Sequence, residues 1–159
     1  MSPTRRGLLF ALAGLPWLAS AQGKLGERVL WPTVVTVDGR RLAPSHFEGK
    51  VVLVNKFATW CPFCRVVNPK LDRFYKTHQA KGLELLFLAI DRNPADVPKY
   101  MSERGYPFPA AMWSRDWEER LGAVKGLPII WIVGRDSRIK QIEAGELHDE
   151  DVAEFARWL

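Results

Sequence analysis

The chain contains two cysteines, and both lie in one short motif, Trp60-Cys61-Pro62-Phe63-Cys64. Two thiols separated by two residues lie one helical turn apart on the same face, within reach of a disulfide. This spacing suits three kinds of chemistry: a structural disulfide, half of a metal site, or reversible thiol–disulfide exchange.

The structural and metal interpretations are the weaker ones. A disulfide that closes a loop of four residues stabilises a fold by only about 2 kcal/mol. A tetrahedral metal site needs further ligands, and the three histidines, His46, His78 and His148, are isolated in the sequence. The motif therefore favours a redox pair.

The elements on either side of the motif predict how the two thiols differ. Residues 51–57 form a nearly continuous, β-branched apolar run, typical of a strand buried on both faces. After the motif, apolar residues repeat at intervals of three and four, which predicts a helix over residues 62–79. At the helix N-terminus, free N–H groups and the helix dipole would stabilise the thiolate of Cys61 and lower its pKa. We therefore expect Cys61 to be the exposed attacking thiol and Cys64, one turn deeper, the sheltered resolving thiol.

The rest of the chain predicts an α/β domain with helices on both sides of a sheet. Asp38-Gly39 favours a primed turn in a small β-hairpin between residues 33–37 and 40–42. The other patterns predict strands at 83–90, 129–133 and 139–143, and helices at 96–104 and 149–159.

The motif and its surroundings resemble the thioredoxin superfamily, and within it the exported TlpA/ResA-like thiol–disulfide oxidoreductases. The resemblance covers about residues 30–159. It implies a thioredoxin-like α/β fold, with a central mixed sheet, helices on both faces and an N-terminal β-hairpin. The residues that carry it are Leu42, Phe47 to Asn55, Ala58 to Arg65, Pro69, Gly126-Leu127-Pro128 and the strand Ile129 to Val133.

The resemblance also implies which residues shape the site around Cys61 and Cys64. Pro128 would be a cis-proline that faces the disulfide, and the backbone of Leu127 would then be available to an extended substrate segment. Trp60 would form a flat apolar wall, although a core tryptophan is the alternative. Pro62 and Phe63, between the cysteines, would complete the site. No cofactor is expected apart from the redox-active disulfide Cys61–Cys64.

Three positions depart from the family pattern. Asn55 stands where thioredoxins proper have a buried acid, Val67 where many ResA-like proteins have a glutamate, and Lys56 where an aromatic residue is usual. Without an obvious carboxylate base, water or a substrate group would have to deprotonate Cys64. Lys56 could add positive potential at Cys61 or extend away from it.

The composition fits one globular domain preceded by an export signal. The chain has 159 residues, of which 47% are hydrophobic, so a disordered or multi-span membrane protein is excluded. A basic start, an apolar stretch and the small residues Ala19-Ser20-Ala21 predict a cleavable secretory signal at residues 1–21. Arg5-Arg6 also fits a twin-arginine signal, and without cleavage the chain would stay tethered to a membrane. Residues 22–29 would be a linker and residues 30–159 the thioredoxin-like domain.

The charge and the motif together limit the function. Removal of residues 1–21 lowers the formal net charge from +5 to +3, which gives no footprint for nucleic acid. We expect a monomeric, periplasmic protein disulfide oxidoreductase that acts on protein thiols and disulfides as a reductant, with a membrane protein as electron donor. The alternatives are a disulfide-forming oxidant, a copper chaperone that uses Cys61 and Cys64, and a thiol peroxidase, which Ala58 disfavours because peroxiredoxins have threonine there.

Overall fold

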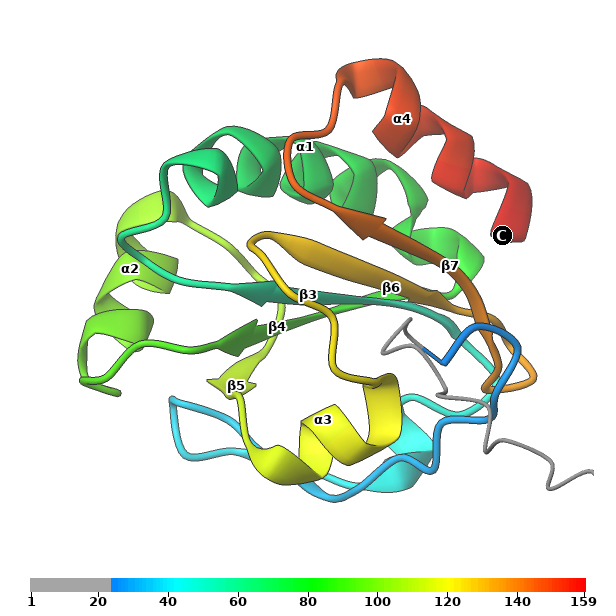
Figure 1. The fold of residues 1–159 in the computed structure, drawn as a ribbon, viewed down its shortest axis with the longest axis horizontal. Helices are drawn as coiled ribbons and strands as arrows, with labels where there is room; N and C mark the ends of the chain where they lie inside the picture. The colour runs from blue at the N-terminus through cyan, green and yellow to red at the C-terminus, as the bar shows by residue number, and fades with distance from the viewer. Residues whose placement is uncertain (1–23) are drawn as a thin grey trace, which may run out of the picture.

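The computed structural model describes residues 24–159, so the predicted signal peptide lies outside the described residues. These residues form a five-stranded mixed sheet in the order β5-β4-β3-β6-β7 (Figure 1). β3 runs parallel to β4 and antiparallel to β6. The predicted thioredoxin-like fold with a mixed sheet is confirmed. The strands are β3 (Val51–Phe57), β4 (Leu83–Ala89), β5 (Ala110–Met112), β6 (Ile129–Val133) and β7 (Ile139–Ala144).

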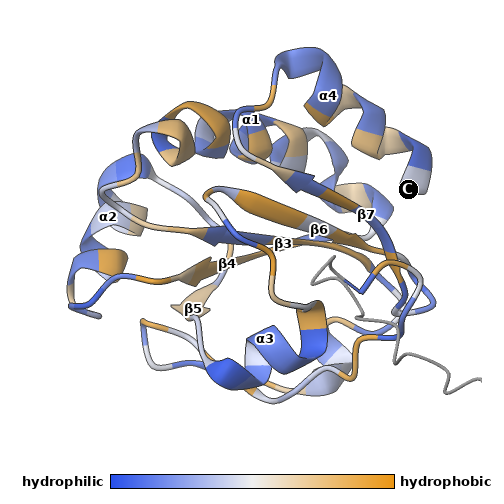
Figure 2. Ribbon diagram, viewed as in Figure 1, coloured by the Kyte–Doolittle hydropathy of each residue, from blue (hydrophilic) through white to orange (hydrophobic). Residues whose placement is uncertain are grey.

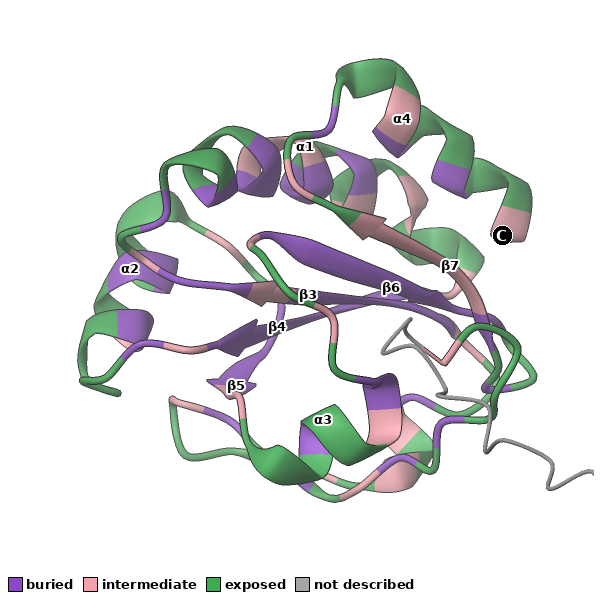
Figure 3. Cartoon of the chain, in the orientation of Figure 1, coloured by how far each residue is buried: buried purple, intermediate pink, exposed green. Residues whose placement is uncertain are grey.

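The three central strands are buried on both faces, as their apolar runs predict. β3, β4 and β6 are mainly apolar and buried, with Asn55, Lys56 and Glu84 as their polar residues, whereas the edge strand β7 is more polar and half-buried (Figures 2 and 3). Side chains alternate along β3: Leu53 faces one side of the sheet, and Val52 and Val54 face the other. The sheet therefore separates two apolar cores.

Helices cover both faces of the sheet (Figure 1). α1 (Pro62–His78), α2 (Asp96–Arg104) and α4 (Asp149–Glu154) pack on the side of Leu53. α3 (Arg115–Leu121) and the N-terminal segment pack on the other side. Both cysteines belong to the core on the side of Leu53, beneath α1, α2 and α4.

The predicted N-terminal hairpin is present, but its turn differs from the prediction. β1 (Val34–Val35) pairs antiparallel with β2 (Arg41–Leu42). A primed turn of type I′ would need positive φ at both Asp38 and Gly39. Gly39 has φ +84°, whereas Asp38 is not among the positive-φ residues, because its carboxylate accepts hydrogen bonds from Thr36 and Arg40 and holds a wider loop.

Other differences concern short elements. The sequence patterns missed β5 and α3, which are only three and seven residues long. The predicted C-terminal helix is α4 followed by a 3₁₀ helix, Phe155–Trp158. Part of the predicted linker 22–29 belongs to the domain, because Val29 is buried and Arg28 forms a β-bridge with Arg138.

Candidate active site

Three segments meet where β3 and β4 end and β6 begins. The register places Phe57, at the end of β3, beside Ala89 of β4, and Lys56 beside Ile129, the first residue of β6. The loop that leaves β3 carries Cys61, and Pro128 directly precedes β6. Parallel strands commonly present functional residues at their carboxyl ends, so this end of the sheet brings together the residues that the sequence singled out.

Cys61 is the N-cap residue of α1. Its backbone is extended (φ −74°, ψ 121°), and its Sγ accepts a hydrogen bond of 3.2 Å from the backbone N–H of Cys64. The N–H of Cys61 donates in turn to the carbonyl of Ala58, also at 3.2 Å. A sulfur that accepts a helix N–H is held where a negative charge is favoured.

The two thiols differ in accessibility and in protonation. Both are free, and Cys64 is wholly buried while Cys61 keeps 4% of its surface exposed. Cys61 is therefore far less exposed than the sequence predicted, because it belongs to the buried apolar cluster that also contains Cys64. Burial raises the pKa of the Cys64 thiol well above its ordinary value, and a hydrogen bond that the protonated thiol donates to Cys61 adds to this effect. Cys64 is thus held as a neutral thiol.

Leu127 and Pro128 lead into β6 beside the same core. The peptide bond between them is cis, and the carbonyl of Pro128 accepts a hydrogen bond of 2.9 Å from the N–H of Gly145. Leu127 is half-buried and packs against the core that contains both cysteines. The structure therefore places the Leu127–Pro128 segment at the same end of the sheet as the C-x-x-C motif.

Exposed apolar side chains surround the motif. Trp60 is 59% exposed, Phe63 is 52% exposed and Val66, on the next turn of α1, is 45% exposed. The alternative of a core tryptophan at Trp60 is therefore wrong. Pro62, the first residue of α1, is also exposed. Apolar side chains that are exposed together in this way are typical of a contact surface.

A buried chain of amides lies behind the cysteines. Asn55 of β3 donates from Nδ2 to Oδ1 of Asn68 at 2.9 Å, and Nδ2 of Asn68 donates to the hydroxyl of Tyr100 at 3.1 Å. Asn55 and Asn68 are both fully buried. The sequence reasoning missed Asn68, although an asparagine four residues after Cys64 on the buried face of the helix was a detectable signal.

The sequence reasoning also missed an acid beside the motif. Asp91 follows β4 and is 6% exposed. Its carboxylate accepts the backbone N–H of Thr59 at 3.1 and 3.2 Å and also the hydroxyl of Thr59. Its place just beyond a parallel strand next to β3 was the available signal.

Lys56 extends away from Cys61. Its Nζ lies 4.4 Å from the centroid of the Trp113 ring and 3.5 Å from the carbonyl oxygen of Val124. Trp113 packs on the core opposite to that of the cysteines. Burial lowers the pKa of Lys56, partly offset by the charge of Glu118. Of the two expectations for Lys56, the structure supports the one that directs it away from the thiols.

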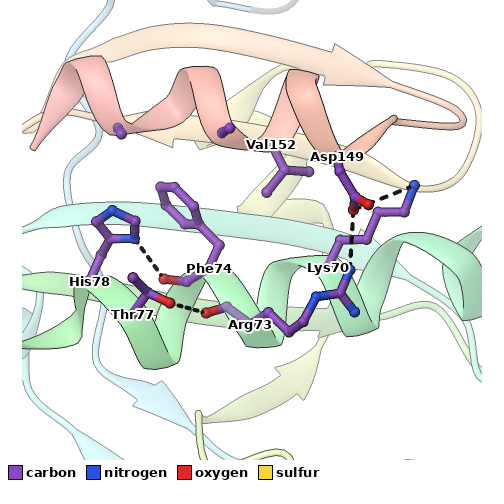
Figure 4. A pocket seen from close by; sticks show the side chains of 9 residues that line it. Lys70, Arg73, Phe74, Thr77, His78, Asp149 and Val152 are labelled. Carbon is purple, nitrogen blue, oxygen red and sulfur yellow. Dashed lines mark hydrogen bonds and ion pairs between the residues drawn. The ribbon is translucent and has the colours of Figure 1, made fainter.

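A separate hollow of about 450 Å³ lies between α1 and α4 (Figure 4). Its basic residues already have partners: Arg73 pairs with Asp149 at 3.1 Å, and Lys70 donates to the carbonyl of Leu147 at 2.7 Å. Phe74 and Val152 form its apolar floor. These contacts fasten α4 to α1.

Within residues 24–159, no group of three or more His, Cys, Asp or Glu side chains is arranged to hold a metal ion. In the same residues, no helix has the length and apolarity needed to cross a membrane.

The comparisons with known proteins define the class to which this geometry belongs. The Redoxin family model matches residues 24–159. The chain therefore belongs to the Redoxin family, and the expected thioredoxin-like disulfide oxidoreductase class is confirmed.

Particular relatives agree with the resemblance to ResA-like proteins. The thiol-disulfide oxidoreductase ResA of Geobacillus thermodenitrificans is 26% identical over 116 residues, which cover 73% of this chain and 67% of that protein. ResA of Bacillus cereus is 25% identical over 124 residues, 78% of this chain and 72% of that protein.

Solved structures show the same fold. A thiol:disulfide interchange protein of Chlorobium tepidum is 24% identical, with a TM-score of 0.73 over 87% of this chain and 97% of that one. A secreted disulfide oxidoreductase of Mycobacterium tuberculosis is 16% identical, with a TM-score of 0.68 over 82% of this chain and 97% of that one.

Proposed function

We propose that this protein reduces disulfides in exported proteins by exchange through Cys61 and Cys64. The observation that carries the proposal is the asymmetry of the two thiols. Cys61 caps α1 and accepts an N–H at 3.2 Å, whereas Cys64 is fully buried and its pKa is raised. Thiol–disulfide exchange through a mixed disulfide needs an attacking thiol with a second, protonated thiol close to it, and Cys61 and Cys64 provide this arrangement.

The first step forms a mixed disulfide. The Cys61 thiolate attacks one sulfur of the substrate disulfide, that S–S bond breaks, and the departing substrate thiolate takes up a proton from water. The exposed Trp60 and Phe63 would contact the apolar surroundings of the substrate disulfide. The backbone of Leu127 would align the substrate segment beside Cys61.

The second step releases the substrate. Cys64 loses its proton and attacks Cys61, the Cys61–substrate bond breaks, and the second substrate thiolate leaves. Because this thiolate is generated as Cys64 loses its proton, it is a suitable acceptor for that proton. The substrate gains two electrons and two protons, and the protein is left with a Cys61–Cys64 disulfide.

Two features support export. Residues 1–21 have the sequence pattern of a secretory signal, and the structural relative from Mycobacterium tuberculosis is described as secreted. In that compartment a membrane protein would return the two electrons, and the protein would act as a monomer. A disulfide-forming oxidant, the reverse reaction, is the second candidate, because the neutral Asn55 and the N–H that Cys61 accepts both favour the thiolate and hence the reduced form.

Trapping of mixed disulfides tests the proposal. Cys64→Ser should accumulate covalent complexes with exported proteins that a thiol reductant releases, and wild-type protein should reduce insulin disulfides when a dithiol is supplied. Cys61→Ser, the matched control, should do neither. Trapping through Cys64 in the Cys61→Ser variant, or tight copper(I) binding without any exchange activity, would refute the proposal.

A further inference from the structure

The buried acid Asp91 is the most unusual group near the motif. A carboxylate that is taken out of water is costly unless a cation or several donors stabilise it. Among residues 24–159, no cationic side chain lies within ion-pair distance of Asp91. Its hydrogen-bond partner is Thr59, through the backbone N–H and the side-chain hydroxyl.

Thr59 is held from both sides. Asp91 accepts hydrogen bonds from the backbone N–H and the hydroxyl of Thr59, and Nε of Arg65 donates to the carbonyl of Thr59 at 3.3 Å. The segment that Asp91 fixes is therefore the one that leads directly into Trp60 and Cys61.

The base of Asp91 is rigid. The N–H of Ile90 donates to the carbonyl of Phe57 at 2.9 Å, which joins the ends of β4 and β3. Asp91 is the next residue, so its backbone is anchored at the end of the sheet by this hydrogen bond. This gives the loop 58–61 a fixed reference point just beyond β4.

We propose that Asp91 is a positioning residue, which acts through Thr59 to hold Cys61 at the N-cap of α1, where its sulfur accepts the N–H of Cys64. The proposal rests on the function inferred above and assigns to that site a residue outside the motif. A shift of Cys61 by a fraction of an ångström would weaken the bond from Cys64 N–H and misdirect the attacking sulfur.

Comparing substitutions at Asp91 and Asp96 distinguishes a positioning role of Asp91 from a simple effect of its negative charge. Asp91 and Asp96 both line the hollow beside Trp60, but Asp96 is exposed and bonds to Asn93. Removal of either negative charge would, through the electrostatic effect alone, favour the Cys61 thiolate. If Asp91 positions Cys61, its removal should instead make Cys61 less reactive.

The test is the rate at which iodoacetamide labels Cys61 in the reduced protein as a function of pH, measured together with insulin reduction. Asp91→Asn should lower both rates on the order of tenfold, below the roughly hundredfold cost of a misplacement of 1 Å. Asp96→Asn should not lower either rate. Thr59→Val, which removes only the hydroxyl, should cause a smaller loss, about threefold, and Thr59→Ser should restore the wild-type rate.

The outcomes are distinct. Equal effects of Asp91→Asn and Asp96→Asn, or faster labelling in both, would overturn the proposal in favour of a simple charge effect. If Thr59→Val labelled at the wild-type rate, the proposal that Asp91 acts through Thr59 would be overturned. This holds even if Asp91→Asn did not fold. If the variants showed the predicted labelling rates but the wild-type protein did not reduce insulin, the role of Asp91 would be supported and the proposed function would be refuted.

Discussion

The two ends of the sheet are stabilised in different ways. At the end where β3 and β4 begin, a side chain clamps two loops: Arg135 donates to the carbonyl of Lys81 at 2.7 Å and to that of Gly49 at 3.3 Å. Nearby, Lys50 pairs with the buried Glu84 at 3.2 Å. These contacts close the turns, and the one buried acid among them, Glu84, has a cationic partner in Lys50.

At the opposite end, the polar groups are inside and the apolar ones are outside. The buried groups include Asn55, Asn68 and Asp91, whereas Trp60 and Phe63 are more than half exposed. This reverses the usual distribution of polar and apolar residues. The difference indicates that the first end serves the fold and the second end positions the cysteines and contacts a substrate.

The largest expected change in stability comes from the buried amides. Asn68→Ala should lower the free energy of unfolding by about 2–3 kcal/mol, because it leaves the amide of Asn55 and the hydroxyl of Tyr100 without their partner. Urea titration measures the change. Asn93→Ala, at an exposed asparagine of the same end that accepts the N–H of Ala95, should cost less, about 1 kcal/mol. Equal values for the two variants would remove the distinction between buried and exposed polar groups.

A smaller loss is expected at the other end. Gly82 and Gly105 have similar left-handed backbones, with φ +80° and +65°, but only an added Cβ at Gly82 would meet Arg135, at 2.9 Å from its Nη1. Gly105→Ala should cost about 1 kcal/mol from the backbone alone. Gly82→Ala should cost about 1 kcal/mol more, because the Arg135 clamp must move.

Gly82→Ala should not change the rate of insulin reduction, since Gly82 lies where β3 and β4 begin, at the end of the sheet opposite the cysteines. An exchange defect in Gly82→Ala would show that the two ends are coupled and that the comparison does not hold.

The smallest change concerns pH. Because the folded state raises the pKa of Cys64, the folded protein retains a proton that the unfolded chain releases above about pH 9. The stabilisation is complete below that pH and is lost as the pH rises. Between pH 9 and pH 10, reduced wild type should lose about 1 kcal/mol more than Cys64→Ala. Identical pH dependence in chemical denaturation would contradict a protonated, buried Cys64.

Long apolar patterns predicted most of the fold. The bounds of β3, α2 and β6 agree with the sequence prediction because continuous or periodic apolar runs end at clear breaks. β5 and α3 were missed because three to seven residues hold too little of a period to detect. The hairpin turn was assigned the wrong type because the side chain of Asp38 determines the turn geometry through hydrogen bonds.

At the site, the sequence predicted the motif but not its supports. Cys61, Cys64 and Pro128 are recognisable by type and spacing. Asn68 and Asp91 act through contacts across 13 and 32 residues, with Asn55 and Thr59, and local spacing does not encode such pairings. The exposure of Cys61 was overestimated because a helix N-terminus predicts the electrostatic environment of a thiol and not how deeply it is buried.

The most direct test of the account is the reduction potential of the Cys61–Cys64 couple, measured by equilibration with a dithiol buffer. Thioredoxin lies near about −270 mV and DsbA near about −120 mV. The neutral Asn55 and the N–H accepted by Cys61 favour the reduced form, but about 2 kcal/mol of such stabilisation moves a two-electron couple by only about 40 mV. We therefore predict a reversible couple at about −230 mV, less negative than thioredoxin and still reducing. A value near that of DsbA would contradict the proposed reductant, and a value below that of thioredoxin would contradict the electrostatic account of Cys61.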